Sequence, residues 1–344
     1  MEYYKFFRPI IFAFDPEFSH TITLKALKLF GNLRVKNNDD PCLGNNLFGK
    51  TFSNPFGLAA GFDKNAEVIN GVLNLGFGFT EIGTITPQPQ NGNPYPRLFR
   101  LKAENAIINR LGFNNLGHCY AHKNLNTLER RGPVGINLGA NRNSLQREQD
   151  YILGVEKFDK LADYFTINIS SPNTPGLRNL QNNSELDNLI KLIKSKSIKS
   201  SIFIKIAPDL SDEELQDIVN IAIKYHLEGL VVSNTTIKRD WHLQDKLSIE
   251  SGGLSGPPLK NLAARLISDI FKVSGKRLTL IGVGGISDGR EAYERIARGA
   301  SLLQLYTALI YRGPFLVRHL KRELIQMMRD DGIKDIKSLI GTLC

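Results

Sequence analysis

A hydroxyl group follows an apolar segment near the middle of the chain, in a loop that could carry out chemistry. Residues 164–169 are rich in aromatic and β-branched side chains, as strands are, and Pro172, Pro175 and Gly176 prevent the strand from continuing. Ser171 is therefore expected at the C-terminal end of a strand. Serine, proline and glycine are also ordinary turn formers, so this segment alone fits an active-site loop or a plain turn equally well.

Proton abstraction is the chemistry that suits Ser171 best. No His-Asp pair is adjacent to it, and the chain has no GxSxG elbow, so the pattern disfavours a hydrolase. A serine can accept a proton from a carbon next to a carbonyl if surrounding amides and ammonium groups stabilise the anion that develops. The proton would then pass on through Thr174 or water.

Four asparagines and a lysine form a second set of candidate residues. Asn109, Asn168, Asn173 and Asn234 are all predicted on loops or strand ends, and each amide offers both donors and an acceptor. Such a set matches a flat molecule with alternating C=O and N–H groups, and Lys64 adds a charge for a carboxylate. An imide ring bearing a carboxylate fits this pattern.

A glycine-rich turn late in the chain suits a phosphate group. Residues 281–287 end a predicted strand and open a helix, residues 252–256 add flexible backbone nearby, and Tyr306 and Thr307 follow the last strand. The alternative is that these glycines only allow tight turns. Because no GxGxxG fingerprint is correctly placed, a flavin mononucleotide fits better than a dinucleotide. Lys205, inside an apolar strand, would face the flavin ring or be a structural ion-pair partner.

Alternating strand-like and helix-like segments must position these residues. Eight apolar runs in βα order predict a (β/α)8 TIM barrel, with the site at the C-terminal ends of the strands. The runs are Phe56 to Ala60, Thr80 to Gly83, Val134 to Leu138, Phe165 to Ile169, Ile202 to Ile206, Leu230 to Ser233, Leu278 to Val283 and Leu302 to Tyr306. Residues 86–132 exceed an ordinary connection and are interpreted as a lid or insertion.

The two ends of the chain differ from this pattern. Phe6, Ile10 and Phe14 recur at helical spacing, and Asp15-Pro16 opens a second helix, so residues 1–40 are predicted as a two-helix unit before a catalytic domain of residues 41–344. Such helices either lie in a membrane interface or pack on the main domain. After Pro314 we expect one further helix and then a loosely held basic end.

Composition narrows the possible classes. The three cysteines are far apart and the six histidines scattered, so we expect neither disulfides nor a metal site. The formal charge of +10 raises the possibility of nucleic-acid binding, but the charge is dispersed and we expect no nucleic-acid partner. No apolar run is long enough to cross a bilayer and no signal peptide is recognisable, which predicts a protein on the cytoplasmic side.

Five segments together resemble class 2, quinone-dependent dihydroorotate dehydrogenase. They are residues 59–64 (AAGFDK), 109–114 (NRLGFN), 168–178 (NISSPNTPGLR), 233–236 (SNTT) and 281–286 (IGVGGI). The resemblance implies an FMN enzyme of pyrimidine synthesis that oxidises dihydroorotate to orotate and reduces a membrane quinone. It also implies a peripheral protein on the cytoplasmic face of the inner membrane, which we expect to be a monomer.

The same resemblance assigns roles to individual residues. Ser171 matches the catalytic base, which takes a proton from C5 of the substrate. Substrate contacts are implied for Lys64, Asn109, Arg110, Leu111, Gly112, Phe113, Asn168, Asn173, Asn234 and Thr235. Flavin contacts are implied for Ala60, Gly61, Lys64, Thr84, Asn137, Asn168, Lys205, Ser233, Gly256, Gly285, Tyr306 and Thr307. His20, Arg100 and Tyr306 match the inner end of a quinone tunnel formed by the N-terminal helices.

Three alternative functions fit the chain less well. A class 1 dihydroorotate dehydrogenase or an RNA-modifying flavin reductase should carry a cysteine in place of Ser171. The former should also lack the N-terminal helices, and the latter should carry an RNA-binding appendage. A catalytically silent membrane scaffold would retain no flavin. One departure from the family is Ala140, where relatives commonly have a lysine, with Arg142 as a candidate substitute.

Overall fold

The centre of the molecule is a closed barrel of parallel strands. The computed structural model describes residues 2–35, 38–239 and 242–344, and within them the barrel has eight strands, each hydrogen-bonded to its neighbours. In order around the barrel they are β3 (Phe56–Leu58), β4 (Phe79–Ile85), β7 (Val134–Leu138), β8 (Tyr164–Asn168), β9 (Ser201–Ile206), β10 (Gly229–Val232), β12 (Thr279–Val283) and β13 (Leu302–Leu305). The predicted fold and all eight predicted strands are confirmed, with ends shifted by one or two residues.

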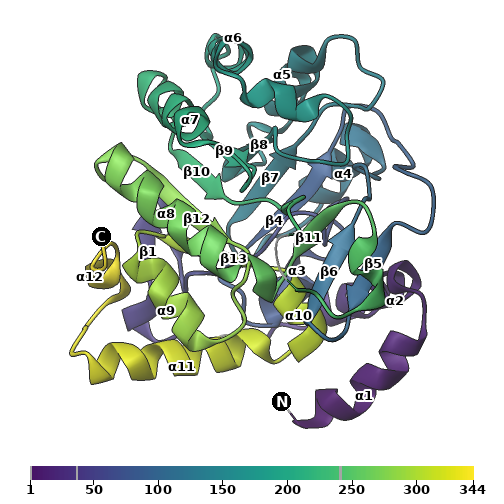
Figure 1. The fold of residues 1–344 in the computed structure, drawn as a ribbon, viewed down its shortest axis with the longest axis vertical. Helices are drawn as coiled ribbons and strands as arrows, with labels where there is room; N and C mark the ends of the chain where they lie inside the picture. Colours follow the sequence, from purple (N-terminus) through teal and green to yellow (C-terminus); the bar gives the residue numbers. More distant parts are fainter. Residues whose placement is uncertain (1, 36–37, 240–241) are drawn as a thin grey trace.

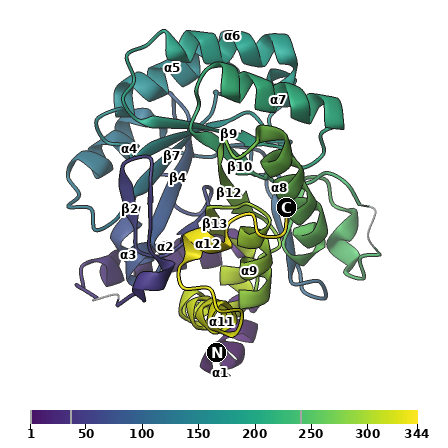
Figure 2. The ribbon, with the colours of Figure 1, turned by 90° about the vertical axis from the view of Figure 1, so that its left-hand side faces the viewer.

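Helices surround this ring of strands, as Figures 1 and 2 show. They are α3 (Ile69–Asn74), α4 (Gly117–Asn126), α5 (Arg147–Phe158), α6 (Asn183–Lys194), α7 (Asp212–Lys224), α8 (Lys260–Ser274), α9 (Gly289–Ala297), α10 (Thr307–Arg312) and α11 (Leu316–Asp330). Short 3-10 turns are η1 (Pro41–Leu43), η2 (Leu177–Gln181), η3 (Lys246–Ile249) and η4 (Pro257–Leu259). Capping residues determine where the helices begin: for example, Ser211 and Glu214 form a capping box at the start of α7.

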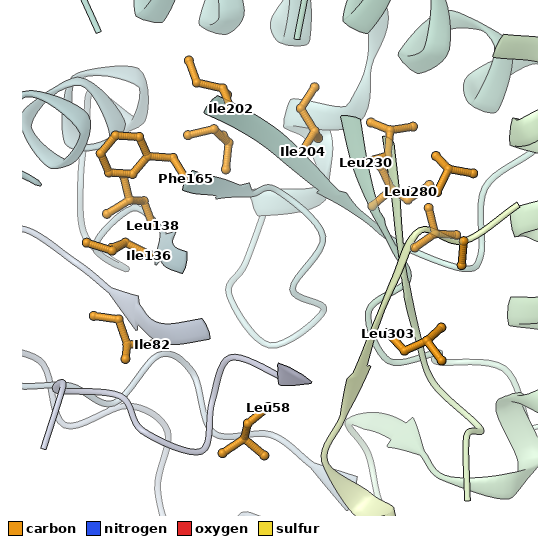
Figure 3. Close-up of a cluster of buried hydrophobic side chains, with 14 of the residues drawn as sticks. Leu58, Ile82, Ile136, Leu138, Phe165, Ile202, Ile204, Leu230, Leu280 and Leu303 are labelled. Carbon is orange, nitrogen blue, oxygen red and sulfur yellow. The ribbon is translucent and has the colours of Figure 1, made fainter. Parts of the chain in front are cut away.

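Alternation along the strands divides the core into two layers. Outward-facing side chains such as Ile82, Phe165 and Leu280 form the layer between strands and helices, and Figure 3 shows them spread around the ring of strands. Inward-facing residues begin with an aromatic layer that includes Phe79. A hairpin of β1 (Asn45–Leu47) and β2 (Lys50–Phe52) closes this end, where the rings of Phe52 and Phe79 pack 5.4 Å apart. The opposite end of the barrel is left for the site.

A small antiparallel sheet lies outside the barrel. It consists of β5 (Leu98–Leu101), β6 (Ala106–Asn109) and β11 (Gly253–Ser255), in the order β11-β6-β5. Residues 86–132 thus supply a hairpin followed by the barrel helix α4. The expectation of flexible backbone at residues 252–256 was wrong, because Gly253 pairs with Asn109 in this sheet.

The two predicted N-terminal helices are present as α1 (Glu2–Ala13) and α2 (Pro16–Gly31). The carboxylate of Asp15 caps α2 by accepting hydrogen bonds from the N–H groups of Glu17 and Phe18, both at 2.9 Å. A Cβ atom on Gly71 would lie 2.1 Å from the Leu27 carbonyl oxygen, so the backbones of α2 and α3 touch. Figure 1 shows α1, in purple, at the edge of the molecule beside α10. No helix among the described residues is long and apolar enough to span a membrane.

The C-terminal segment is packed rather than loosely held, so that expectation was wrong. A last helix, α12 (Ile336–Leu339), buries both Ile336 and Leu339 completely. The N–H of Leu343 then donates to the carbonyl oxygen of Ala297 at 2.8 Å. The prediction relied on the basic composition of this segment and overlooked the apolar residues Ile336 and Leu339, which pack into the core.

Candidate active site

A cavity of about 610 Å³ opens at the C-terminal end of the barrel and collects most of the predicted site residues. Its lining includes Ala60, Gly61, Lys64, Thr84, Asn109, Leu111, Gly112, Phe113, Asn168, Ser171, Asn173, Lys205, Ser233, Asn234, Thr235, Gly256, Gly285, Tyr306 and Thr307. These residues come from loops and strand ends up to about 250 positions apart in the chain, which is where a (β/α)8 barrel places its active site.

Four predicted residues do not line the cavity. Asn137 lies directly behind it, where its Oδ1 accepts a 2.6 Å hydrogen bond from the Thr84 hydroxyl. Arg110 is held away by an ion pair with Glu250 at 2.7 Å, so the geometry does not support direct contact with a bound molecule. His20 belongs to α2 itself, and Arg100 belongs to β5 of the small sheet.

Ser171 is almost completely buried, with 5% of its surface exposed. Its Oγ accepts a hydrogen bond from the N–H of Asn173 at 3.3 Å, which leaves the hydroxyl proton free to point elsewhere. Asn173 is fixed in turn, because its Nδ2 donates to the Asn109 carbonyl oxygen at 3.1 Å. The Oγ1 of Thr174 is buried and has no partner among the described residues, so it stays available for the expected proton relay.

Arg178 joins the Ser171 loop to the loop that follows β10. Its guanidinium donates to the carbonyl oxygen of Ser170 at 3.1 Å, to that of Thr235 at 3.2 Å, and to the carboxylate of Asp209 at 3.0 Å. One planar side chain therefore holds two walls of the cavity at a fixed separation.

Two lysines place positive charge in the cavity. Burial lowers the pKa of Lys64 to about 8, although the nearby carboxylate of Glu17 opposes this shift. Burial also lowers the pKa of Lys205, and the charge of Glu81 opposes it. Lys205 lies inside the barrel, next to Asn168 in the strand register, with 5% of its surface exposed. The inward orientation expected for Lys205 is therefore observed.

Two features of the cavity lining suit a bound cofactor that bears a phosphate and a hydrogen-bond donor. Gly284 and Gly285 line it with φ angles of 101° and 72°, and a Cβ on Gly285 would lie 2.4 Å from the Cα of Lys260. Bare backbone therefore borders the cavity here, and backbone N–H groups suit a phosphate. The Oε1 of Gln304, another lining residue, is buried and lacks a hydrogen-bond partner within the described residues. Such an orphaned acceptor is consistent with a bound molecule that carries a donor.

Sequence reasoning missed the part of the cavity wall that comes from α1 and α10. Tyr4, Lys5 and Arg8 line the cavity together with Tyr311 and Arg312. The Tyr4 hydroxyl donates to the Ile310 carbonyl oxygen at 2.7 Å, across 306 positions of sequence. No local pattern signals a contact over such a separation.

An aromatic path leads from α2 to the cavity. The His20 ring packs edge-on against Phe62 at 5.0 Å, and Phe62 packs against Tyr306 at 5.9 Å. Burial lowers the pKa of His20 to about 3, so its imidazole is uncharged at neutral pH. Arg100 donates to the Phe14 carbonyl oxygen at 3.0 Å.

Arg142, the candidate substitute for the lysine that relatives commonly carry in place of Ala140, does not bring a charge into the central cavity. It borders a separate outer hollow, where its Nη1 donates to the Oδ1 of Asn93 at 2.7 Å. Ala140 is completely buried.

Known proteins resemble this chain along nearly its whole length. A family model described as dihydroorotate dehydrogenase matches residues 42–328. A relative named dihydroorotate dehydrogenase (quinone) from Parvibaculum lavamentivorans is 47% identical over 99% of both chains. One of the same name from Rhodospirillum rubrum is 45% identical, covering 99% of this chain and 94% of its own. The crystal structure of DHODH from Eimeria tenella in complex with ferulenol matches with a TM-score of 0.91 and 41% identity, covering 95% of each chain. This chain therefore belongs to the dihydroorotate dehydrogenase family, in its quinone-dependent class.

Proposed function

We propose that this chain oxidises dihydroorotate to orotate in pyrimidine synthesis, with FMN as its cofactor and a membrane quinone as the final electron acceptor. One observation carries the proposal: Ser171, Lys64 and Lys205 line a single cavity together with four asparagine amides. The relatives named above support the activity.

Each residue has a distinct task in this proposal. The ammonium of Lys64 binds the substrate carboxylate, and the amides of Asn109, Asn173 and Asn234 hold the ring edges in one orientation. Ser171 Oγ takes the proton from C5 and releases its own proton toward Thr174 or water. FMN, when it is bound, would supply the acceptor for the hydride that leaves C6, which completes the two-electron oxidation. Lys205 places a positive charge where negative charge develops on reduction.

Anaerobic mixing with dihydroorotate tests the reaction directly. We expect the purified protein to be yellow, and we expect substrate to bleach its flavin absorbance and yield orotate. Flavin released by denaturation should migrate with FMN in chromatography. A protein that retains no flavin, releases FAD, or keeps its absorbance when substrate is added would overturn the proposal.

The N-terminal helices, within the unit of residues 1–40, are proposed to mount the protein on the membrane and admit the quinone. Large apolar side chains along α1 and α2 are exposed: Phe6 by 76%, Ile10 by 61%, Phe18 by 52% and Leu29 by 72%. Basic residues flank them, which suits an anionic lipid surface. We infer a monomer bound peripherally to the cytoplasmic face of the inner membrane.

Vesicle sedimentation tests this attachment. We expect the full chain to sediment with anionic phosphatidylglycerol vesicles and a Phe6→Ser/Ile10→Ser variant to remain in solution with its flavin reduction intact. Light scattering in detergent should give the mass of one chain. Equal sedimentation of the two proteins, or a dimeric mass, would contradict the corresponding part of the proposal.

A further inference from the structure

A completely buried carboxylate, Glu81, lies inside the barrel below the cavity and has no role in the proposed reaction. Its Oε1 accepts from Asn137 Nδ2 at 2.7 Å. Its Oε2 accepts from the Tyr164 hydroxyl at 3.0 Å, the Thr166 hydroxyl at 3.0 Å and Gln304 Nε2 at 2.7 Å. Four donors converge on one side chain, and Glu81 itself is not among the cavity's described lining residues.

A carboxylate only accepts hydrogen bonds, so it fixes the orientation of the amide beside it. The NH2 group of Asn137 must face Glu81, and its oxygen must therefore face the cavity side. That oxygen accepts from the Thr84 hydroxyl at 2.6 Å and from Asn168 Nδ2 at 3.0 Å. Asn168 Nδ2 also donates to Thr84 Oγ1 at 3.0 Å.

The hydrogen bonds donated toward Glu81 continue to the substrate side of the cavity. The Ser170 hydroxyl donates to Asn168 Oδ1 at 3.1 Å, and Asn234 Nδ2 donates to Ser170 Oγ at 3.0 Å. Every hydrogen bond from Asn234 to Glu81 thus runs toward the carboxylate. Reversing Asn137 would turn its oxygen toward the carboxylate of Glu81, acceptor against acceptor, and its NH2 group toward the NH2 group of Asn168, donor against donor. Both contacts are costly in a buried network.

This direction determines what the lining residues can offer. Because the hydrogen of the Thr84 hydroxyl is used by Asn137, Thr84 presents only a lone pair to the cavity. Asn234 uses one hydrogen of its amide on Ser170 and keeps the other for a ligand. Gln304 turns its NH2 group to Glu81, which leaves its Oε1 as the unpartnered acceptor described above.

We propose that Glu81 is a positioning residue that sets the donor and acceptor pattern of Thr84, Asn168, Asn234 and Gln304 toward flavin and substrate. The inference rests on the proposed function, because it concerns the same cavity. It goes beyond that function by naming a residue that touches neither ligand and yet determines how both are recognised.

Glu81→Gln tests the proposal with almost no change in shape. A glutamine can turn its NH2 group toward Asn137, so the amide of Asn137 is no longer held in one orientation. We expect the variant to bind orotate roughly tenfold more weakly, measured by the change in flavin absorbance on titration, because one buried hydrogen bond is then misdirected. Binding of FMN to the flavin-free protein should weaken in the same way.

Two further variants distinguish an effect of hydrogen-bond direction from a general disturbance of the structure around Glu81. In Glu81→Gln/Asn137→Asp the carboxylate moves to position 137, where it accepts from the new amide at position 81, from Thr84 and from Asn168, so we expect the affinity for orotate to recover. Tyr164→Phe removes one donor to Glu81 without releasing Asn137, and we expect it to bind orotate as the unaltered chain does.

A failure of the proposed function can be distinguished from a failure of the role proposed for Glu81. If the unaltered chain holds no flavin or fails to react with dihydroorotate, the proposed function fails. If it reacts, three outcomes refute the role of Glu81: unchanged orotate and FMN affinity in Glu81→Gln, an equal loss in Tyr164→Phe, or no recovery in the double variant. Should Glu81→Gln not fold, the double variant still decides, because it reverses only the bond between positions 81 and 137, keeps the direction of the bonds from Thr84 and Asn168, and is expected to bind both ligands normally.

Discussion

The affinity for orotate should depend on pH through Lys64. Burial brings the pKa of its ammonium down to about 8, so the group changes charge within the range in which the protein can be studied. At pH 7 about nine tenths of the Lys64 side chains carry a proton, and at pH 9 about one tenth do. In the proposed binding mode, only the protonated form of Lys64 pairs with the substrate carboxylate. Affinity is therefore present below the pKa and is lost as pH rises through it, which predicts a roughly tenfold higher Kd for orotate at pH 9 than at pH 7.

Titration of the flavin absorbance with orotate between about pH 6.5 and about pH 9 measures this directly. Two variants identify the group. Lys64→Gln should bind weakly with a flat pH profile, and Glu17→Gln should move the midpoint to lower pH, because the carboxylate of Glu17 raises the pKa of Lys64. His20 does not compete as an explanation, since its pKa of about 3 keeps it uncharged throughout. A flat profile in the unaltered chain, or the same slope in Lys64→Gln, would refute the reasoning.

Three further predictions concern the base, the N-terminal helices and the C-terminal end. Ser171→Ala should slow flavin reduction by about a hundredfold or more in stopped flow while leaving FMN bound; loss of FMN would mean that the serine is structural. Removing residues 1–30 should spare flavin reduction but impair turnover with a long-chain quinone, and unchanged quinone turnover would exclude the tunnel. Leu339→Ala should lower the free energy of unfolding by about 2–5 kcal/mol in a denaturant titration, because its side chain is completely buried; an unaltered midpoint would mean that α12 contributes nothing to the fold.

The barrel could be predicted because its strands are short, apolar and separated by helices, so each one is visible in a local window. The rim residues followed from this, since polar groups just after a buried strand must gather at one edge. Ser171, Lys64 and Lys205 were found in this way.

Other features depend on contacts that no local window contains. Tyr4 and Arg8 are held at the cavity by hydrogen bonds that their side chains donate to the carbonyl oxygens of Ile310 and Tyr311 in α10, about 300 positions away. Glu81 lies inside a predicted strand, but its importance comes from donors on three other strands. Strand β11 was missed because three residues rich in glycine and serine carry no strand signal and are held by pairing with β6 and by a backbone bridge between Leu254 and Thr236.

The wall that α1 contributes to the cavity has a kinetic consequence. Tyr4 and Arg8 border the interior, while Phe6 and Ile10 on the same helix face outward and are exposed. On a bilayer, the acceptor would reach the enzyme by lateral diffusion among the lipids without entering bulk water. Turnover should then depend on the mole fraction of quinone in the lipid. Diluting the bilayer with quinone-free lipid would therefore slow the enzyme, even though the total amounts of enzyme and quinone stay the same.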